Sequence, residues 1–353
     1  MVRKRIGVYL TLKVFLVAIV LVMVGAGVFA YEMYKGVYSP SIFLNKNKEF
    51  EYMYIHTNAT MADVDSIINN QFKVRYPEAL QMVIEKKNFT KVKPGKYRIL
   101  NGMSNNALIN LLRSGNQEEV NYTIKFHRTL AEAVHQASLG IEPKEADIMA
   151  AFTDSLLLDS LGMTKENVIC LFVPNTYRIY WNTQPKDFVR RLHREYKAFW
   201  NDIRSQRARE LKMTPEQVVT MASIVDRETK WNDEKPRIAG VYLNRFHRGI
   251  KLQADPTIVF ASGDFALRRV LNRHLEIPSP YNTYINTGLP PGPICTPSTP
   301  SIESVLYPEK HNYLFFCAKT DFSGYHSFAS TYEEHNANAK CFRDALNERS
   351  IFK

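Results

Sequence analysis

The stretch MASIVDRET, residues 221–229, carries two carboxylates near the end of a predicted helix. That helix begins at Thr214, because Thr214-Pro215-Glu216-Gln217 combines a capping box with proline at the first helical position. Successive helical residues turn by about 100°, so Asp226 and Glu228 lie roughly 200° apart around the axis. They therefore cannot form a side-by-side acid–base pair while the helix persists.

Glu228 is predicted to occupy the apolar face of this helix. It follows Val225, Ile224 and Met221 at the spacing of residues that share one helical face. We expect Glu228 to project from the inward-packing face and Asp226 to project away from it. Burial disfavours the charged form of a carboxyl and raises its pKa, which suits a general acid that must hold a proton near neutral pH.

An ordinary structural role for Glu228 is the alternative. A glutamate near a helix end commonly forms a salt bridge, and the sequence offers Arg227, Lys230 or Arg245 as its partner. The helical geometry alone does not separate this role from catalysis.

Polar and aromatic residues gather downstream in Gln253–Pro297, a stretch rich in proline and glycine. It contains a predicted polar turn at Gln253–Thr257, the run Tyr281-Asn282-Thr283-Tyr284 and proline turns at Gly288–Ile294. This content predicts shaped loops rather than regular structure. Aromatic rings with fixed amides and hydroxyls suit a saccharide groove, whereas the alternative for each element is a structural turn.

The N-terminus contains a candidate membrane segment. Residues 14–31 read VFLVAIVLVMVGAGVFAY without a charge, and these 18 residues approach the roughly 20 that span a bilayer. Arg3, Lys4 and Arg5 precede it and predict a cytoplasmic N-terminus, with the rest of the chain outside. The alternative is a cleaved signal peptide with AGVFA, residues 26–30, as its cleavage site.

The composition limits the kinds of partner that the protein is expected to bind. The chain has 353 residues, enough for two or three domains, and its net charge of +11 suits an anionic partner or a well-solvated basic surface. Zinc-knuckle, helix-turn-helix and RNA-binding signatures are missing from the sequence, so nucleic acid is not expected. The four cysteines match neither a zinc site nor a CxxC pair, so we expect free, buried thiols and no metal.

Between the membrane segment and the acidic helix, short strands alternate with capped helices. A strand at Glu51–Ile55 precedes a helix capped by Thr60, and a strand at Tyr97–Leu100 precedes a helix capped by Ser104 and ended by Gly115. Further predicted elements are a strand at Val120–Phe126, helices after Thr129, Pro143, Pro236, Ser298 and Thr331, and a strand at Tyr313–Cys317. The aromatic segment Ile169–Trp181 favours a core strand, and the alternative is a saccharide-stacking surface.

Several ordered motifs carry a family resemblance. The succession ASIVDRET, GVYLNR, LQADPT, YNTY and GLPPGPI, from about residue 218 to 297, resembles the MltG/YceG-like endolytic murein transglycosylases. The family's catalytic glutamate corresponds to Glu228. Departures from the family pattern are Asp226 for glutamate, Ala254 for threonine, Asn175 for aspartate and Cys170 for glycine.

The resemblance implies a reaction and a set of site residues. Protonated Glu228 would cleave the bond between MurNAc and GlcNAc within a glycan strand, and the MurNAc C6 hydroxyl would close a 1,6-anhydro ring without water or a cofactor. The substrate-binding candidates, which could instead hold the loops in shape, are Gln253, Asp255, Tyr281, Asn282 and Tyr284. The implied partners are peptidoglycan strands and penicillin-binding proteins. The implied location is the bacterial inner membrane, with one pass.

The predicted fold class is α+β. The strand–helix units around Lys96–Ile99 and Ser104–Leu112 resemble a LysM-like module, which would occupy residues 45–120. A cytoplasmic tail at 1–12 and a transmembrane anchor at 13–33 precede it. A mixed α/β catalytic domain with proline-rich loops follows at 121–353, with its core at 214–345.

Two rival functions remain open at the level of the sequence. A membrane-anchored peptidoglycan-binding scaffold would keep the groove but would not need Glu228. A pyridoxal-phosphate lyase would need a Schiff-base lysine and a glycine-rich phosphate cup, and the sequence offers no convincing cup.

Overall fold

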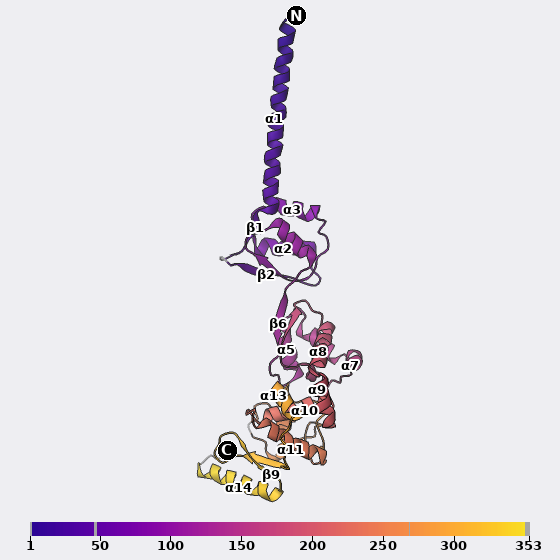
Figure 1. Ribbon diagram of the computed structural model, residues 1–353, viewed down its shortest axis with the longest axis vertical. Helices are drawn as coiled ribbons and strands as arrows, with labels where there is room; N and C mark the ends of the chain where they lie inside the picture. The colour runs from indigo at the N-terminus through magenta and orange to yellow at the C-terminus, as the bar shows by residue number, and fades with distance from the viewer. Residues whose placement is uncertain (1, 46–47, 268, 350–353) are drawn as a thin grey trace. The chain divides into compact units, whose positions relative to one another are not determined.

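The computed structural model describes residues 2–45, 48–267 and 269–349 (Figure 1). It divides into two compact units, residues 1–120 with 179–182 and residues 121–178 with 183–353. The parts of the predicted tail, module and catalytic domain that fall on residues 1, 46–47, 268 and 350–353 lie outside the described residues. The assignment of these segments as a cytoplasmic tail, a transmembrane anchor, a LysM-like module and a catalytic domain stays a prediction.

The chain begins with a long helix, α1 (Val2–Tyr38). Within the described residues, its Lys13–Tyr38 portion is the one helix long and apolar enough to cross a membrane. The helix continues past residue 33, where the predicted anchor ends, because its last turns have local support. Lys35 pairs with Glu32 at 3.4 Å, and the rings of Tyr34 and Tyr38 lie 5.0 Å apart.

The remainder of the first unit packs three helices against small sheets. Strand β2 (Phe50–Ile55) pairs antiparallel with β4 (Gly95–Leu100), which brings buried Met53 opposite buried Tyr97. Thr60 caps α2 (Met61–Gln71) and Ser104 caps α4 (Asn105–Ser114), and Gly115 ends α4 in the left-handed conformation, as the sequence predicts. The other elements are β1 (Pro40–Phe43), β3 (Lys73–Val74), α3 (Pro77–Lys86) and β5 (Met103–Ser104).

Strands β6 (Glu119–Thr123) and β7 (Thr176–Tyr180) have residues in both units, and a set of short helices belongs to the second unit. The helices here are α5 (Leu130–Ser138), α6 (Glu145–Thr153), α7 (Ser155–Leu161), η2 (Val168–Leu171), α8 (Pro185–Phe199) and α9 (Asp202–Glu210). Strand β6 pairs with β7. Residues 169–173, Tyr177 and Ile179 are buried, so most of the aromatic segment packs as core.

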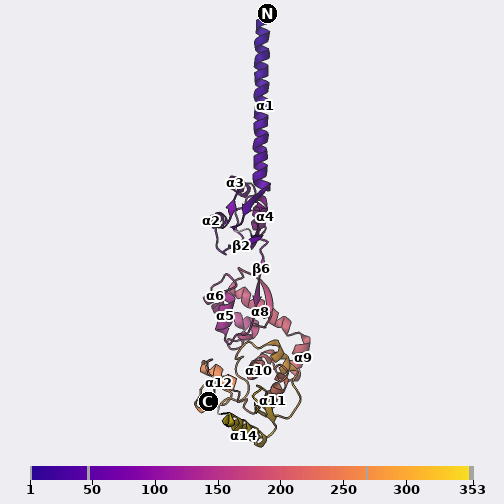
Figure 2. The same cartoon turned by 90° about the vertical axis from the view of Figure 1, so that its left-hand side faces the viewer.

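The rest of the second unit surrounds α10 (Pro215–Glu228). Helix α10 packs against α11 (Lys235–His247) and α13 (Thr299–Leu306), and α11 also packs against α13 (Figures 1 and 2). Capping boxes begin α10 at Thr214 and α14 (Tyr332–Glu348) at Thr331, as predicted. The hairpin of β8 (Phe315–Ala318) and β9 (His326–Ala329) precedes α14.

Two predictions for this unit are wrong. The stretch Gln253–Pro297, predicted to be irregular, contains α12 (Asp255–Ser262) and the short helix η3 (Asn272–His274). Pro256 lies in the first turn of α12 and Gly263 ends it with φ +69°, so these residues delimit a helix rather than prevent one. All four cysteines are free, but Cys341 is exposed and Cys317 is only partly buried.

Candidate active site

Helix α10 is buried on every side over its second half. Residues 218–225 are all buried, so an apolar stripe along one face is only part of its packing. The two carboxylates that follow therefore leave the helix into two different protein environments, and neither is an ordinary surface residue.

Asp226 lies in a buried ion pair. Its Oδ1 accepts hydrogen bonds from Lys235 Nζ at 2.9 Å, from Ser298 Oγ at 2.6 Å and from Ser301 Oγ. The side chains of Lys235 and Asp226 are only 6% and 13% exposed. Burial acts to raise the pKa of Asp226, but these hydrogen bonds and the Lys235 charge outweigh it and hold the pKa below its usual range.

The expected orientation of Asp226 needs a correction. Asp226 does project away from the Met221–Val225 stripe, but it projects into the packing of α10 against α11 and α13. The spacing along the helix therefore predicted the direction of the Asp226 side chain correctly. It could not predict that α11 and α13 cover that side of α10.

Glu228 has the opposite electrostatic environment. Its carboxyl is half-buried, and its Oε1 accepts a hydrogen bond from the Tyr242 hydroxyl at 2.5 Å. Burial raises the pKa of Glu228 to about 7, the Tyr242 hydrogen bond lowers it in part, and the negative charge of Asp255 raises it further. A carboxyl with this pKa can both donate and accept a proton near neutral pH.

The salt-bridge alternative for Glu228 is not what the structure contains. In the described part of the chain, Glu228 forms no ion pair with Arg227, Lys230 or Arg245. Arg245 instead donates from Nε to the Lys251 carbonyl oxygen and from Nη1 to the Leu314 carbonyl oxygen, each at 2.9 Å. Its Nη2 donates to Gln253 Oε1 at 2.5 Å.

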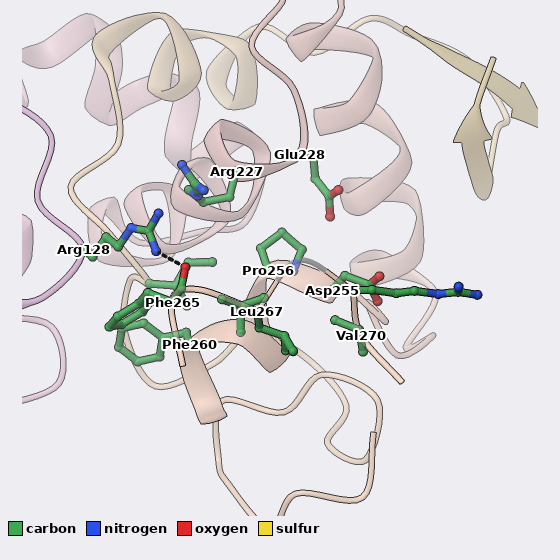
Figure 3. Close-up of a pocket in the computed structure, with 12 residues that line it drawn as sticks. Arg128, Arg227, Glu228, Asp255, Pro256, Phe260, Phe265, Leu267 and Val270 are labelled. Atoms are coloured by element: carbon green, nitrogen blue, oxygen red, sulfur yellow. Dashed lines mark hydrogen bonds between the residues drawn. The ribbon is translucent and has the colours of Figure 1, made fainter. Parts of the chain in front are cut away.

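Glu228 and Asp255 line two cavities. The first, of about 450 Å³, extends along α12 and is shown in Figure 3, where the Glu228 carboxyl points toward the space above Pro256. The second, of about 380 Å³, extends toward α11 and β8 and includes Tyr242, Arg245 and Phe315. The Glu228 carboxyl therefore opens onto space for a ligand in two directions.

The first group of predicted binding residues lies at this junction. Asp255 is the first residue of α12, and its Oδ1 accepts a hydrogen bond from the Tyr284 hydroxyl at 2.6 Å. Gln253 has a left-handed backbone with φ +52° and accepts from Arg245. Of Gln253–Thr257, predicted as a polar turn, Gln253 and Ala254 precede α12 and Asp255–Thr257 form its first turn. Asp255 lines both cavities, and Gln253 and Tyr284 line the second.

Tyr281 and Asn282 lie behind the cavity walls. Asn282 is fully buried, and its amide donates to the carbonyl oxygens of Leu275 and Ile277, each at 2.9 Å. The Tyr281 ring packs 4.6 Å from the Phe260 ring, and burial raises the pKa of Tyr281 to about 12. Neither residue lines the two cavities, so their contribution to the site is through the shape of the loops.

Sequence reasoning missed several residues that shape the site. Tyr242 contacts the key carboxyl, and it lies within the GVYLNR motif, but its position 14 residues after Glu228 gave no local signal of that contact. Arg128, Phe315 and His335 come from elements remote in sequence. Among the described residues, no group of three or more histidines, cysteines, aspartates or glutamates is placed to hold a metal ion.

The fold and site define an α+β protein with one carboxyl of raised pKa at the junction of two open cavities. Residues 53–341 match the YceG-like family, and the chain belongs to that family.

Individual relatives agree with this assignment. The chain is 28% identical over 314 residues to the endolytic murein transglycosylase of Bacillus subtilis (strain 168), covering 84% of this chain and 85% of the relative. It is 23% identical to the endolytic murein transglycosylase of Streptococcus pneumoniae serotype 2, covering 83% of this chain and 58% of that protein. A crystal structure of a YceG-like protein from Listeria monocytogenes aligns with a TM-score of 0.54 and 26% identity, covering 82% of this chain and 99% of that one.

Proposed function

We propose that this chain is an endolytic murein transglycosylase, a lyase that cleaves peptidoglycan glycan strands, with Glu228 as its catalytic acid and base. The observation that carries the proposal is the half-buried Glu228 carboxyl, whose pKa is raised to about 7 where two cavities meet. The relatives named endolytic murein transglycosylase support the same reaction.

The proposed reaction uses one carboxyl twice. Protonated Glu228 donates its proton to the oxygen that joins MurNAc to GlcNAc, while the MurNAc N-acetyl oxygen attacks C1 and the C1–O bond breaks. Ionised Glu228 then takes the proton of the C6 hydroxyl as O6 attacks C1 and displaces the acetyl oxygen. The products are a free GlcNAc end and a 1,6-anhydro-MurNAc end, and no water is consumed. A pKa near 7 suits both proton transfers.

Neighbouring side chains prepare the carboxyl for these transfers. The Tyr242 hydroxyl occupies Oε1 and fixes the side-chain orientation, which leaves Oε2 for the substrate. Tyr284 holds Asp255 beside the site, so that a fixed negative charge helps Glu228 retain its proton. We assign Gln253, Asp255 and Tyr284 to the substrate-facing wall and Tyr281 and Asn282 to the support behind it.

Cleavage of a bond between two sugars requires room for a sugar on each side of the acid. The two cavities of about 450 and 380 Å³ on either side of Glu228 offer that room. The relatives named endolytic murein transglycosylase support cleavage within the strand rather than at its end. The raised pKa of Glu228 where the two cavities meet favours an enzyme over the non-catalytic scaffold, which would not need this carboxyl.

The proposal also extends to the location. Arg3, Lys4 and Arg5 support a cytoplasmic N-terminus, α1 supports a single-pass anchor, and the catalytic domain would then act outside the cytoplasm of the cell. The capped helices and small sheets of residues 45–120 support a LysM-like module. Nascent glycan strands near penicillin-binding proteins would be the substrate, and their cleavage would limit strand length.

Mass spectrometry of the products from purified glycan strands tests the proposal. Native protein should release fragments with 1,6-anhydro-MurNAc ends, and Glu228→Gln protein should release none above background. Anhydro ends formed equally well by the variant, or absent with the native protein, would contradict the proposed function.

A further inference from the structure

The two cavities beside Glu228 differ in charge. Three arginines from separate segments line the first cavity: Arg128 before α5, Arg227 on α10 and Arg269 after α12. The second cavity has one arginine, Arg245, and its guanidinium is committed to two backbone carbonyls and to Gln253. A ligand with negative charge would therefore be favoured in the first cavity.

Neutral groups hold two of these arginines in place. Arg128 Nη1 donates to the Phe265 carbonyl oxygen at 2.9 Å, as Figure 3 shows, and its guanidinium lies 5.1 Å from the Phe265 ring. Arg227 is exposed, with its guanidinium 5.4 Å from the Phe126 ring. Within the described residues, neither Arg128 nor Arg227 forms an ion pair, so both keep charge and donors for a ligand.

The chemistry of a carboxylate fits this cluster. Guanidinium groups present planar pairs of donors that match carboxylate oxygens, and they stay protonated at any physiological pH. In peptidoglycan, MurNAc carries peptide stems with free carboxylates and GlcNAc carries none. The charge difference between the cavities therefore corresponds to a chemical difference between the two sugars at the cleaved bond.

We propose that the cavity lined by Arg128, Arg227 and Arg269 binds the free carboxylates of the peptide stem on the MurNAc whose C1 reacts. This inference rests on the proposed function and adds a substrate preference to it. It also orients the strand, because MurNAc then lies along α12 and GlcNAc lies in the second cavity, beside Tyr242 and Phe315.

The experiment compares three sets of glycan strands of equal length, which carry free-carboxylate stems, amidated stems or no stems. The native protein should cleave the free-carboxylate strands with a kcat/KM roughly fivefold higher than the others, the factor expected for partly exposed ion pairs. This ratio should fall as salt is added.

Arginine variants locate the preference. Arg227→Gln and Arg128→Gln should each bring the ratio of kcat/KM for charged to amidated strands closer to one. Arg190→Gln is the matched control, because Arg190 is an exposed arginine on α8 that pairs with Asp187 and lines neither cavity. The ratio is compared within each variant, so a loss of folded protein lowers both rates and leaves the ratio unchanged.

The outcomes separate this inference from the proposed function. Two results would overturn the stem-carboxylate site. One is a native protein with the same kcat/KM for free-carboxylate and amidated strands. The other is a ratio of these two kcat/KM values that neither Arg128→Gln nor Arg227→Gln changes. The proposed function would still hold after either result if the native protein cleaves all three strand types and Glu228→Gln abolishes that cleavage. A native protein that cleaves none of them would contradict the proposed function itself.

Discussion

Asp226 and Glu228 are two carboxylates of one helix, two residues apart, with opposite acid–base properties. Asp226 accepts three hydrogen bonds, one of them from a buried lysine, and its pKa is lowered. Glu228 accepts one hydrogen bond from a neutral tyrosine, has Asp255 nearby, and its pKa rises to about 7. The partners supplied by distant segments, rather than the residue type, therefore separate a structural carboxylate from a catalytic one.

The largest expected effect is the loss of activity on changing Glu228. Glu228→Gln keeps the shape of the side chain but removes the transferable proton, so kcat should fall by roughly 10³-fold or more. Steady-state release of anhydro-muropeptides measures this loss. Circular dichroism of the variant should stay native, and a variant that retains a tenth of the native rate would break the contrast between the two carboxylates.

Changing Asp226 should instead affect stability. Asp226→Asn leaves the buried Lys235 without its counter-charge and should lower the free energy of unfolding by about 3 kcal/mol, as measured by urea denaturation. The matched control is Asp187→Asn, which removes an exposed ion pair with Arg190 and should cost less than about 1 kcal/mol. Equal effects of the two changes would show that Asp226 is not a buried structural partner.

The two carboxylates should also give opposite dependences of stability on pH. The folded pKa of Glu228 lies above its unfolded value of about 4.5, so the folded state binds more protons and native stability should fall from about pH 4.5 to 7. The folded pKa of Asp226 lies below its unfolded value of 3.8, so its contribution is present above that pH and is lost on acidification. Thermal melts of the native, Glu228→Gln and Asp226→Asn proteins from about pH 3 to about pH 8 measure both dependences. The fall in stability toward neutral pH should disappear in Glu228→Gln, and the loss on acidification should be smaller in Asp226→Asn.

The smallest effect expected here comes from the tyrosine beside Glu228. Tyr242→Phe removes the hydrogen bond that stabilises ionised Glu228, so the pKa should rise and the alkaline limb of the rate profile should move to higher pH. Poorer positioning should also lower kcat by roughly tenfold. Tyr325→Phe is the control, because Tyr325 bonds to Asp233 and lines neither cavity. A Tyr242→Phe profile that overlays the native one would mean that the tyrosine only packs.

Local signals were sufficient for much of the fold. The capping residues Thr60, Ser104, Thr214 and Thr331 act within one turn of their own helices, so a short stretch of sequence predicts them. The spacing of Glu228 after an apolar run predicted a partly buried carboxyl of raised pKa for the same reason.

The remainder depends on contacts between segments that are far apart in sequence. Asp226 is buried because Ser298 and Ser301 of the α13 region reach it, and nothing near Asp226 signals that contact. The start of α12 was interpreted as a turn because Pro256 and Gly263 mark both helix ends and loops. The distribution of arginines between the two cavities follows from the tertiary fold and has no sequence signature.

A titration of the Glu228 carboxyl itself decides whether this residue can act as a general acid at neutral pH. Carbon-13 NMR of glutamate-labelled protein, with the Glu228→Gln protein to assign the resonance, would follow this one carboxyl between neutral and acidic pH. The expected midpoint lies near pH 7. A midpoint at or below the ordinary glutamate value of about 4.5 would contradict it, because the carboxyl would then hold no proton to donate at neutral pH.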